Sequence, residues 1–129
     1  MTPSPGIQLR SVVLDCPDPV ALARFYADLL DARAETSDPD WCEVHVEGAA
    51  FKLAFQRAQP YRAPDWPDGA PQQVHLDLTV TDLDATSRRA VGLGATVLSG
   101  PVEEPGCVFM VYADPVGHPF CLCRERPVG

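Results

Sequence analysis

The sequence predicts an α+β fold made of two tandem βαβββ modules, in which a curved mixed sheet surrounds a cup. The first observation is an internal repeat. Residues 11–18 (SVVLDCPD) and residues 75–82 (HLDLTVTD) both alternate apolar side chains and both end in aspartate. The second is that apolar residues at helical spacing follow each of these runs. The third is a later match, because residues 48–53 (GAAFKL) correspond to residues 117–122 (GHPFCL).

The first module is expected to place one helix after its first strand. That helix covers residues 19–30, where apolar side chains gather on one face. Asp18 precedes it as an N-cap whose carboxylate accepts free N–H groups of the first turn. Pro19 suits the first helical position, where no N–H group is needed. Three strands follow, at residues 33–36, 41–46 and 51–56.

The second module repeats this order. Its first strand leads to Asp82, which is the expected N-cap of a helix over residues 83–93. Gly94 is expected to end that helix in a left-handed conformation. The remaining strands are predicted at residues 95–98, 108–113 and 120–123.

The two modules are expected to form one domain over residues 1–129. The first module spans about residues 8–57 and the second about residues 73–124. The proline-rich segment between them, about residues 58–72, cannot form regular structure and is predicted to be a linker. Its Tyr61 and Trp66 are expected to attach the linker to the body of the protein, and a lid over a ligand is the alternative.

Composition restricts the partners. The chain has 10 Lys and Arg residues against 18 Asp and Glu residues, a formal net charge of -8. This balance argues against a nucleic acid or an anionic membrane surface as the partner, because both attract basic proteins. No apolar run approaches the roughly 20 residues of a membrane span. A neutral or cationic small molecule is the expected partner.

The five cysteines are an odd number without the spacing of a zinc site. The first residues lack the basic and apolar stretches of a secretion signal. We therefore expect a cytoplasmic protein whose cysteines are free thiols.

The strand pattern places an unusual set of polar groups on the sheet face opposite the helices. Alternate residues of a strand point to opposite faces, so the apolar residues turn toward the helices and leave the others on the second face. The candidate ligand-binding residues on this second face are Ser11, Asp15, Lys52, His75, Asp77 and Cys121. Trp41, Glu43 and His45 are expected on the same face.

This organisation resembles the vicinal oxygen chelate superfamily, which includes glyoxalase I, bleomycin-resistance proteins and extradiol dioxygenases. The resemblance rests on four motifs that together cover almost the whole chain: residues 12–18 (VVLDCPD), 74–82 (VHLDLTVTD), 93–96 (LGAT) and 114–122 (DPVGHPFCL). It is nearest to the small glyoxalase-like branch. The resemblance implies the two-module cup and a homodimer, sometimes formed by exchange of modules.

The resemblance also implies a position for a metal, which this sequence fills poorly. The corresponding ligand positions are Ser11, Lys52, His75 and Cys121, and only His75 and Cys121 have side chains that suit a divalent ion. Lys52 places a positive charge beside the site. A divalent metal is therefore not favoured, and no cofactor is expected, although Asp15, Asp77, Glu43 and His45 remain alternative ligands.

Three functional hypotheses remain open. The first is a metal-free domain that binds and sequesters a small molecule, as bleomycin-resistance relatives do. The second is a lyase, isomerase or dioxygenase that uses His75 with a metal or with Lys52 and Cys121, where Cys121 would be a thiolate of lowered pKa and a tentative catalytic residue beside His75. The third is a protein that acts through association, with an unused cup. Lys52 is expected either to bind an anionic group of the ligand or to pair with Asp15 or Asp77.

Overall fold

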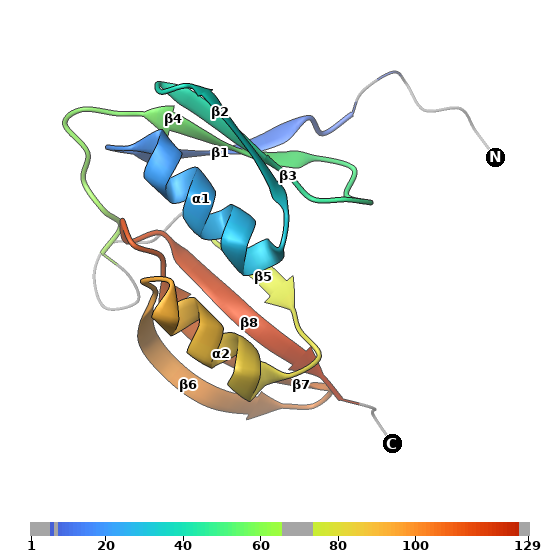
Figure 1. Cartoon of the computed structure of the whole chain (residues 1–129). Helices are drawn as coiled ribbons and strands as arrows, with labels where there is room; N and C mark the ends of the chain where they lie inside the picture. Colours follow the sequence, from blue (N-terminus) through green and yellow to red (C-terminus); the bar gives the residue numbers. More distant parts are fainter. Residues whose placement is uncertain (1–5, 7, 66–73, 127–129) are drawn as a thin grey trace. The chain divides into compact units, whose positions relative to one another are not determined.

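The chain folds into two compact units, Met1–Gln59 and Pro60–Gly129, each of which contains one βαβββ module (Figure 1). The computed structural model describes residue 6, residues 8–65 and residues 74–126. Within these residues, no helix is long and apolar enough to cross a membrane.

The first unit is a four-stranded mixed sheet with one helix against it. Its sheet has the order β1-β4-β3-β2, in which β1 and β4 are parallel and the other neighbours are antiparallel. Figure 1 shows the helix lying across one face of this sheet. The elements are β1 (Ser11–Cys16), α1 (Pro19–Leu30), β2 (Arg33–Asp38), β3 (Trp41–His45) and β4 (Lys52–Arg57).

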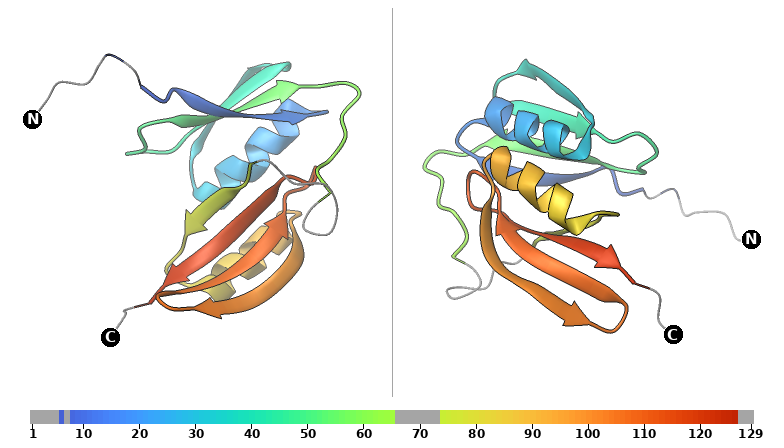
Figure 2. Two further views of the ribbon diagram at one scale, coloured as in Figure 1. Left: turned by 180° about the vertical axis from the view of Figure 1, so that it is seen from behind. Right: turned by 60° about the horizontal axis from the view of Figure 1, so that its bottom comes forward.

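The second unit has the same topology. Its order is β5-β8-β7-β6, with β5 and β8 parallel and the other neighbours antiparallel. Seen from behind, in the left view of Figure 2, this sheet lies in front of its helix and shows the face that the helix does not cover. The elements are β5 (Leu76–Thr79), α2 (Leu83–Gly92), β6 (Thr96–Glu104), β7 (Cys107–Ala113) and β8 (Pro119–Glu125).

Alternation along the strands produces one buried face in each sheet, as the sequence predicted. In the first unit Tyr26 of α1 stacks on Phe55 of β4 with ring centroids 5.6 Å apart, and both side chains are fully buried. In the second unit Tyr112 of β7 stacks on Phe120 of β8 at 5.2 Å. Burying each of these aromatic side chains stabilises its unit by about 1.5–3 kcal/mol. The other face of each sheet is thereby left to polar side chains.

The predicted helix ends are confirmed. The carboxylates of Asp18 and Asp82 accept hydrogen bonds from Ala21 N (3.2 Å) and Ala85 N (3.0 Å). Gly94 follows α2 with a φ of 117°, a left-handed conformation that glycine adopts without strain. Both helices therefore begin and end close to the positions that local chemistry indicated.

The strand after α2 is longer than the sequence indicated. The prediction ended it at residue 98, before Gly100 and Pro101, but β6 continues to Glu104. The pairing of β6 with β7 shifts register between Val97 and Val102. Such bulges allow a strand to pass a proline, because the ladder is interrupted where the N–H group is missing.

Tyr61 attaches the linker to the second unit, as the sequence predicted. Residues 58–65 form no helix or strand. The Tyr61 hydroxyl donates a hydrogen bond to the Val116 carbonyl at 3.0 Å and lies 3.3 Å from Nε2 of His118. Trp66 and the rest of the predicted linker lie outside the described residues.

Candidate functional site

An ion-pair cluster centred on Glu43 lies on the open face of the first sheet, away from α1. Nζ of Lys52 is 3.1 Å from Oε1 of Glu43, and Nε2 of His45 is 3.3 Å from the same oxygen. The Trp41 indole donates a hydrogen bond of 3.1 Å to the other carboxylate oxygen. The Trp41 hydrogen bond and then the Lys52 ammonium hold the pKa of Glu43 below its ordinary value, although burial opposes them. Glu43 is therefore an ionised group with both oxygens in use.

This arrangement changes the expected partner of Lys52. The sequence left Asp15 and Asp77 as candidate ion-pair partners, but the ammonium group pairs with Glu43. The reason is the antiparallel register, in which Glu43 of β3 lies opposite Ala54 of β4. Lys52 lies two residues before Ala54 on the same face, and a long side chain spans that diagonal.

Ser11 and Asp15 also lie on the open face of the first sheet. Ser11 is the register partner of Lys52 in the parallel β1–β4 pair, and it is half-buried. Asp15 is exposed and lies opposite Gln56, at the other end of the same pair. The structure thus brings Ser11 close to the Glu43 cluster and places Asp15 further along the strand.

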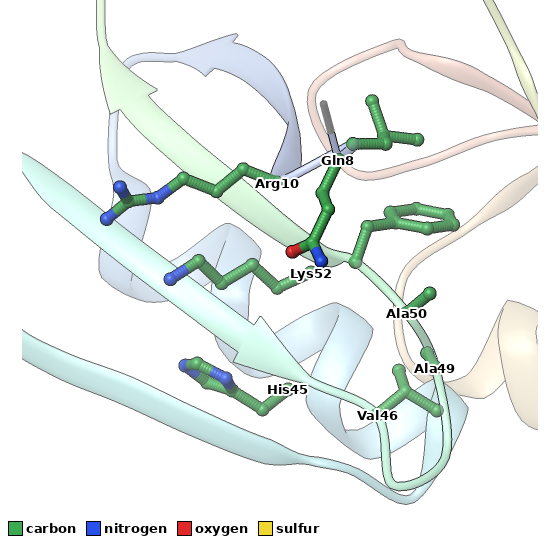
Figure 3. Close-up of a pocket in the computed structure, with 9 residues that line it drawn as sticks. Gln8, Arg10, His45, Val46, Ala49, Ala50 and Lys52 are labelled. Atoms are coloured by element: carbon green, nitrogen blue, oxygen red, sulfur yellow. The ribbon is translucent and has the colours of Figure 1, made fainter. Parts of the chain in front are cut away.

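A pocket of about 450 Å³ adjoins this cluster (Figure 3). Its polar lining comes from Gln8, Arg10, His45 and Lys52. Figure 3 shows the side chains of Arg10, Lys52 and His45 extending to the same side of the strands. Its apolar lining comes from the chain before β1 and from the loop between β3 and β4: Leu9, Val46, Ala49, Ala50 and Phe51.

Sequence reasoning did not identify Gln8 or Arg10 as site residues. Both precede β1, so strand alternation did not assign them to a face. The backbone brings them in, because Lys52 N donates a hydrogen bond of 3.2 Å to the Arg10 carbonyl. The local signal that could have indicated them is Arg10 itself, a basic residue directly before the first strand of the repeat.

A pocket of the second unit has the opposite charge. It measures about 510 Å³ and lies at the start of α2. Its lining includes three carboxylates and one guanidinium, those of Asp82, Asp84, Glu103 and Arg124. Asp82 is occupied as the helix cap. The basic pocket of the first unit therefore stands out in an acidic chain.

The second unit brings together three of the predicted site residues: His75, Asp77 and Cys121. Nε2 of His75 is 3.2 Å from Oδ1 of Asp77. Asp77 and Cys121 are register partners in the parallel β5–β8 pair. One nitrogen, one oxygen and one sulfur of these residues all lie within 4.8 Å of one another.

The structure disfavours the thiolate of lowered pKa that the enzyme hypothesis places at Cys121. The side chain is buried, and burial followed by the neighbouring Asp77 carboxylate raises the pKa of the thiol to about 11. Both causes disfavour a negative charge on sulfur. At neutral pH Cys121 is therefore a thiol and a poor nucleophile.

The donor chemistry of this cluster fits a divalent ion such as zinc better than the sequence indicated. Zinc accepts imidazole nitrogen, carboxylate oxygen and thiolate sulfur, and a bound ion removes the thiol proton. Asp77 adds a third donor to the two that the sequence identified. Ser11 and Lys52 in the first unit do not suit a divalent ion, because Lys52 carries a positive charge and is paired with Glu43.

The expectation of five free thiols is also wrong. Cys107 of β7 and Cys123 of β8 form a disulfide across the hairpin, with Cα atoms 6.4 Å apart. Cys16, Cys42 and Cys121 carry buried thiols that are not in a disulfide. The sequence did not show the pair because it depends on the β7–β8 register, in which Cys123 lies opposite Phe109.

The third histidine belongs to a structural turn. Asp114 is buried, and its Oδ1 accepts hydrogen bonds from Val116 N at 2.9 Å and His118 N at 3.0 Å. Asp114 and His118 are therefore held together in one turn. The candidate residues therefore form one group in each unit, and their union in a single cup stays a prediction.

Comparison with known proteins gives the family. The model of the family described as "Glyoxalase-like domain" matches residues 11–123. The chain belongs to this glyoxalase-like family. The expected membership of the vicinal oxygen chelate superfamily is thereby confirmed, and so is the fold class.

Solved structures share this glyoxalase-like fold at low sequence identity. A glyoxalase/bleomycin resistance protein/dioxygenase family enzyme from Burkholderia phytofirmans is 18% identical, with a TM-score of 0.75 over 93% of this chain and 100% of the other. The oxidase ChaP-H2 is 24% identical, with a TM-score of 0.66 over 96% of this chain and 97% of the other.

A curated relative matches only part of the glyoxalase-like chain. The uncharacterized protein Mb0911c of Mycobacterium bovis is 44% identical over 55 residues, which are 42% of this chain and 35% of that protein. The match therefore spans about a third of the relative's length.

Proposed function

We propose that this glyoxalase-like protein binds a small organic molecule on the open face of its first module, without a resident metal ion. The observation that carries the proposal is the 3.1 Å ion pair between Lys52 and Glu43. It places an ammonium group where metal-using relatives are expected to have a ligand, and it commits the nearest carboxylate to that ammonium group. A second cation at this position would be repelled at close range.

The pocket beside the ion pair supports binding of a small molecule. Its volume of about 450 Å³ lies within the roughly 300–1,000 Å³ typical of ligand sites. It combines an apolar wall with several hydrogen-bond donors, a composition that both holds and orients an organic ligand.

Metal content and ligand binding test the proposal together. The protein is purified without chelator, and its Zn, Ni, Mn and Fe are measured by mass spectrometry. Calorimetric titration with a panel of small aromatic acids, amides and amines follows. We expect metal well below one equivalent and binding of at least one class. Stoichiometric metal that disappears in His75→Ala would contradict the metal-free proposal.

A metal-dependent enzyme is the second candidate, and the His75, Asp77 and Cys121 cluster favours it. These three residues would hold the ion within the second unit, and the ion would supply Lewis-acid polarisation of a bound oxygen. In that case the exposed His75 and Asp77 side chains would fix its position, while Cys121 would bind as a thiolate.

Cobalt titration distinguishes this candidate by spectroscopy. A cysteine-bound Co²⁺ ion gives a sulfur-to-metal charge-transfer absorption, which should appear in the parent protein and vanish in Cys121→Ser. Asp77→Asn should weaken the titration, whereas Asp84→Asn, an exposed change on α2, should leave it unchanged. Absence of the absorption in the parent protein would remove the metal enzyme from consideration.

A further inference from the structure

We infer that the pocket lined by Arg10, His45 and Lys52 receives the carboxylate of an amphiphilic organic acid. The inference rests on the proposed binding function and specifies the class of ligand. It differs from the cationic or neutral ligand that the overall charge of the chain indicated.

The local charge of the pocket opposes the net charge of the chain. The formal net charge is -8, yet among the residues that the structure describes the lining contains an arginine, a lysine and a histidine, and no carboxylate. Lys52 is the only lysine in the sequence. The pocket therefore attracts an anion locally while most of the surface repels one.

Glu43 orients the side chains of this pocket without cancelling its positive charge. Its Oε1 contacts both Lys52 and His45, so it fixes the positions of two side chains that line the pocket. The lysine retains N–H donors beyond the one directed at Glu43. Among the described residues no carboxylate forms a salt bridge with Arg10, so its positive charge remains to be balanced.

The charge count favours a carboxylate over a phosphate. Arg10 and Lys52 carry two positive charges and Glu43 carries one negative charge, so these three side chains together leave about one positive charge. A monoanionic carboxylate balances that charge, whereas a phosphate dianion would exceed it. The planar guanidinium of Arg10 also suits a two-point hydrogen bond to a carboxylate.

The rest of the lining indicates an apolar body for the ligand. Leu9 is 61% exposed and Phe51 is 39% exposed, so two large apolar side chains border the pocket in contact with water. Val46, Ala49 and Ala50 extend this wall. Removing these apolar groups from water is favourable, so an aromatic or branched aliphatic acid fits better than a small polar one.

Matched probes test the inference. Calorimetry or NMR titration is performed with 3-phenylpropionate, 3-phenylpropionamide, 3-phenylpropylamine and phenyl phosphate. We expect 3-phenylpropionate to bind with a Kd of about 1 mM, as a small fragment does. The amide and the phosphate should bind about tenfold more weakly and the amine should not bind, because only the carboxylate supplies one negative charge. Amide resonances near Arg10 and Lys52 should shift.

Two charge-removing variants locate the site. Arg10→Gln should weaken 3-phenylpropionate about tenfold, and Lys52→Gln should do the same. Arg24→Gln is the matched control. Arg24 is exposed on α1, so its replacement removes the same charge on the other side of the sheet. Its affinity should stay within the error of the parent. Arg10 is exposed and its replacement is not expected to disturb folding, so it tests the inference even if the Lys52 variant unfolds.

The outcomes separate the inference from the proposed function. If the amide or the amine binds at these residues as well as the acid, the carboxylate inference is wrong and the binding function stands. Stronger binding of phenyl phosphate would likewise overturn the choice of carboxylate. If no probe shifts any resonance of the open face, both the inference and the proposed function fail.

Discussion

Replacing Asp114, a small side chain, should clearly lower the free energy of unfolding of the second unit. It is 3% exposed, and its Oδ1 accepts two backbone hydrogen bonds, of 2.9 Å from Val116 N and 3.0 Å from His118 N. Hydrogen bonds to a charged acceptor contribute about 1.5–3 kcal/mol each. The two N–H groups belong to half-buried residues and can reach water after the change, so the lower end of that range applies.

We therefore expect Asp114→Ala to lower the free energy of unfolding by about 3 kcal/mol. Asp114→Asn keeps an acceptor oxygen but loses the charge, and it should lower this free energy by about 1 kcal/mol. Asp18→Ala is the control, because it removes one exposed cap bond to Ala21 N at 3.2 Å and should lower it by about 1 kcal/mol.

Chemical denaturation followed by NMR measures this effect. Resonances of the second unit report its unfolding separately from that of the first, which matters because two units need not unfold together. If Asp114→Ala destabilises the second unit no more than Asp18→Ala destabilises the first, the turn does not depend on the buried carboxylate. The argument from burial would then be refuted.

Three further predictions concern the cysteines and Glu43. Alkylation of Cys121 by iodoacetamide, followed by peptide mass mapping, should accelerate with pH up to about 11, and an apparent pKa near the ordinary value of about 8.5 would contradict its burial. The protonated Cys121 thiol contributes its full stability to the folded protein below the pKa of the unfolded thiol. This stability is lost as pH rises through the folded pKa of about 11. The pKa of Glu43 is lowered in the folded protein, so its ionised form stabilises the fold. The parent should therefore be more stable than Glu43→Gln above about pH 4.3, and this difference should fade as pH falls through the folded pKa. Denaturation at several pH values measures the difference. Alkylation of the unfolded protein without reductant should modify 3 of its 5 cysteines, and modification of all of them would exclude the bond between Cys107 and Cys123.

Local chemistry accounts for the parts of the fold that were predicted well. Asp18 and Asp82 cap the helices through N–H groups three residues away, and Gly94 ends α2 through its own backbone freedom. These signals act between close neighbours in sequence, so they can be recognised in the sequence. Strand length was predicted less well, because β6 continues past Pro101 by pairing with β7, a strand that follows it in the chain.

The candidate site also combines features that local sequence determines with features that depend on strand pairing. Alternation assigned Lys52, Glu43 and His45 to one face, since the side-chain direction of a strand residue depends only on its place in the strand. The contact between Lys52 and Glu43 depends on the register of two strands, and alternation does not contain that register. Arg10 precedes the first strand, so the pattern assigned it no face at all.

The repeat, the helix caps and the inward and outward faces were thus encoded in local sequence, because short-range hydrogen bonding and the two-residue period of a strand produce them. Three features arose only when separate strands paired in a particular register: the Glu43 ion-pair cluster, the Cys107–Cys123 bond and the proximity of Asp77 to Cys121. The basic pocket depends on the same pairing. A net charge of -8 is a sum over the whole chain, whereas a ligand responds to the few charges that folding places within a Debye length of it, about 8 Å at physiological salt.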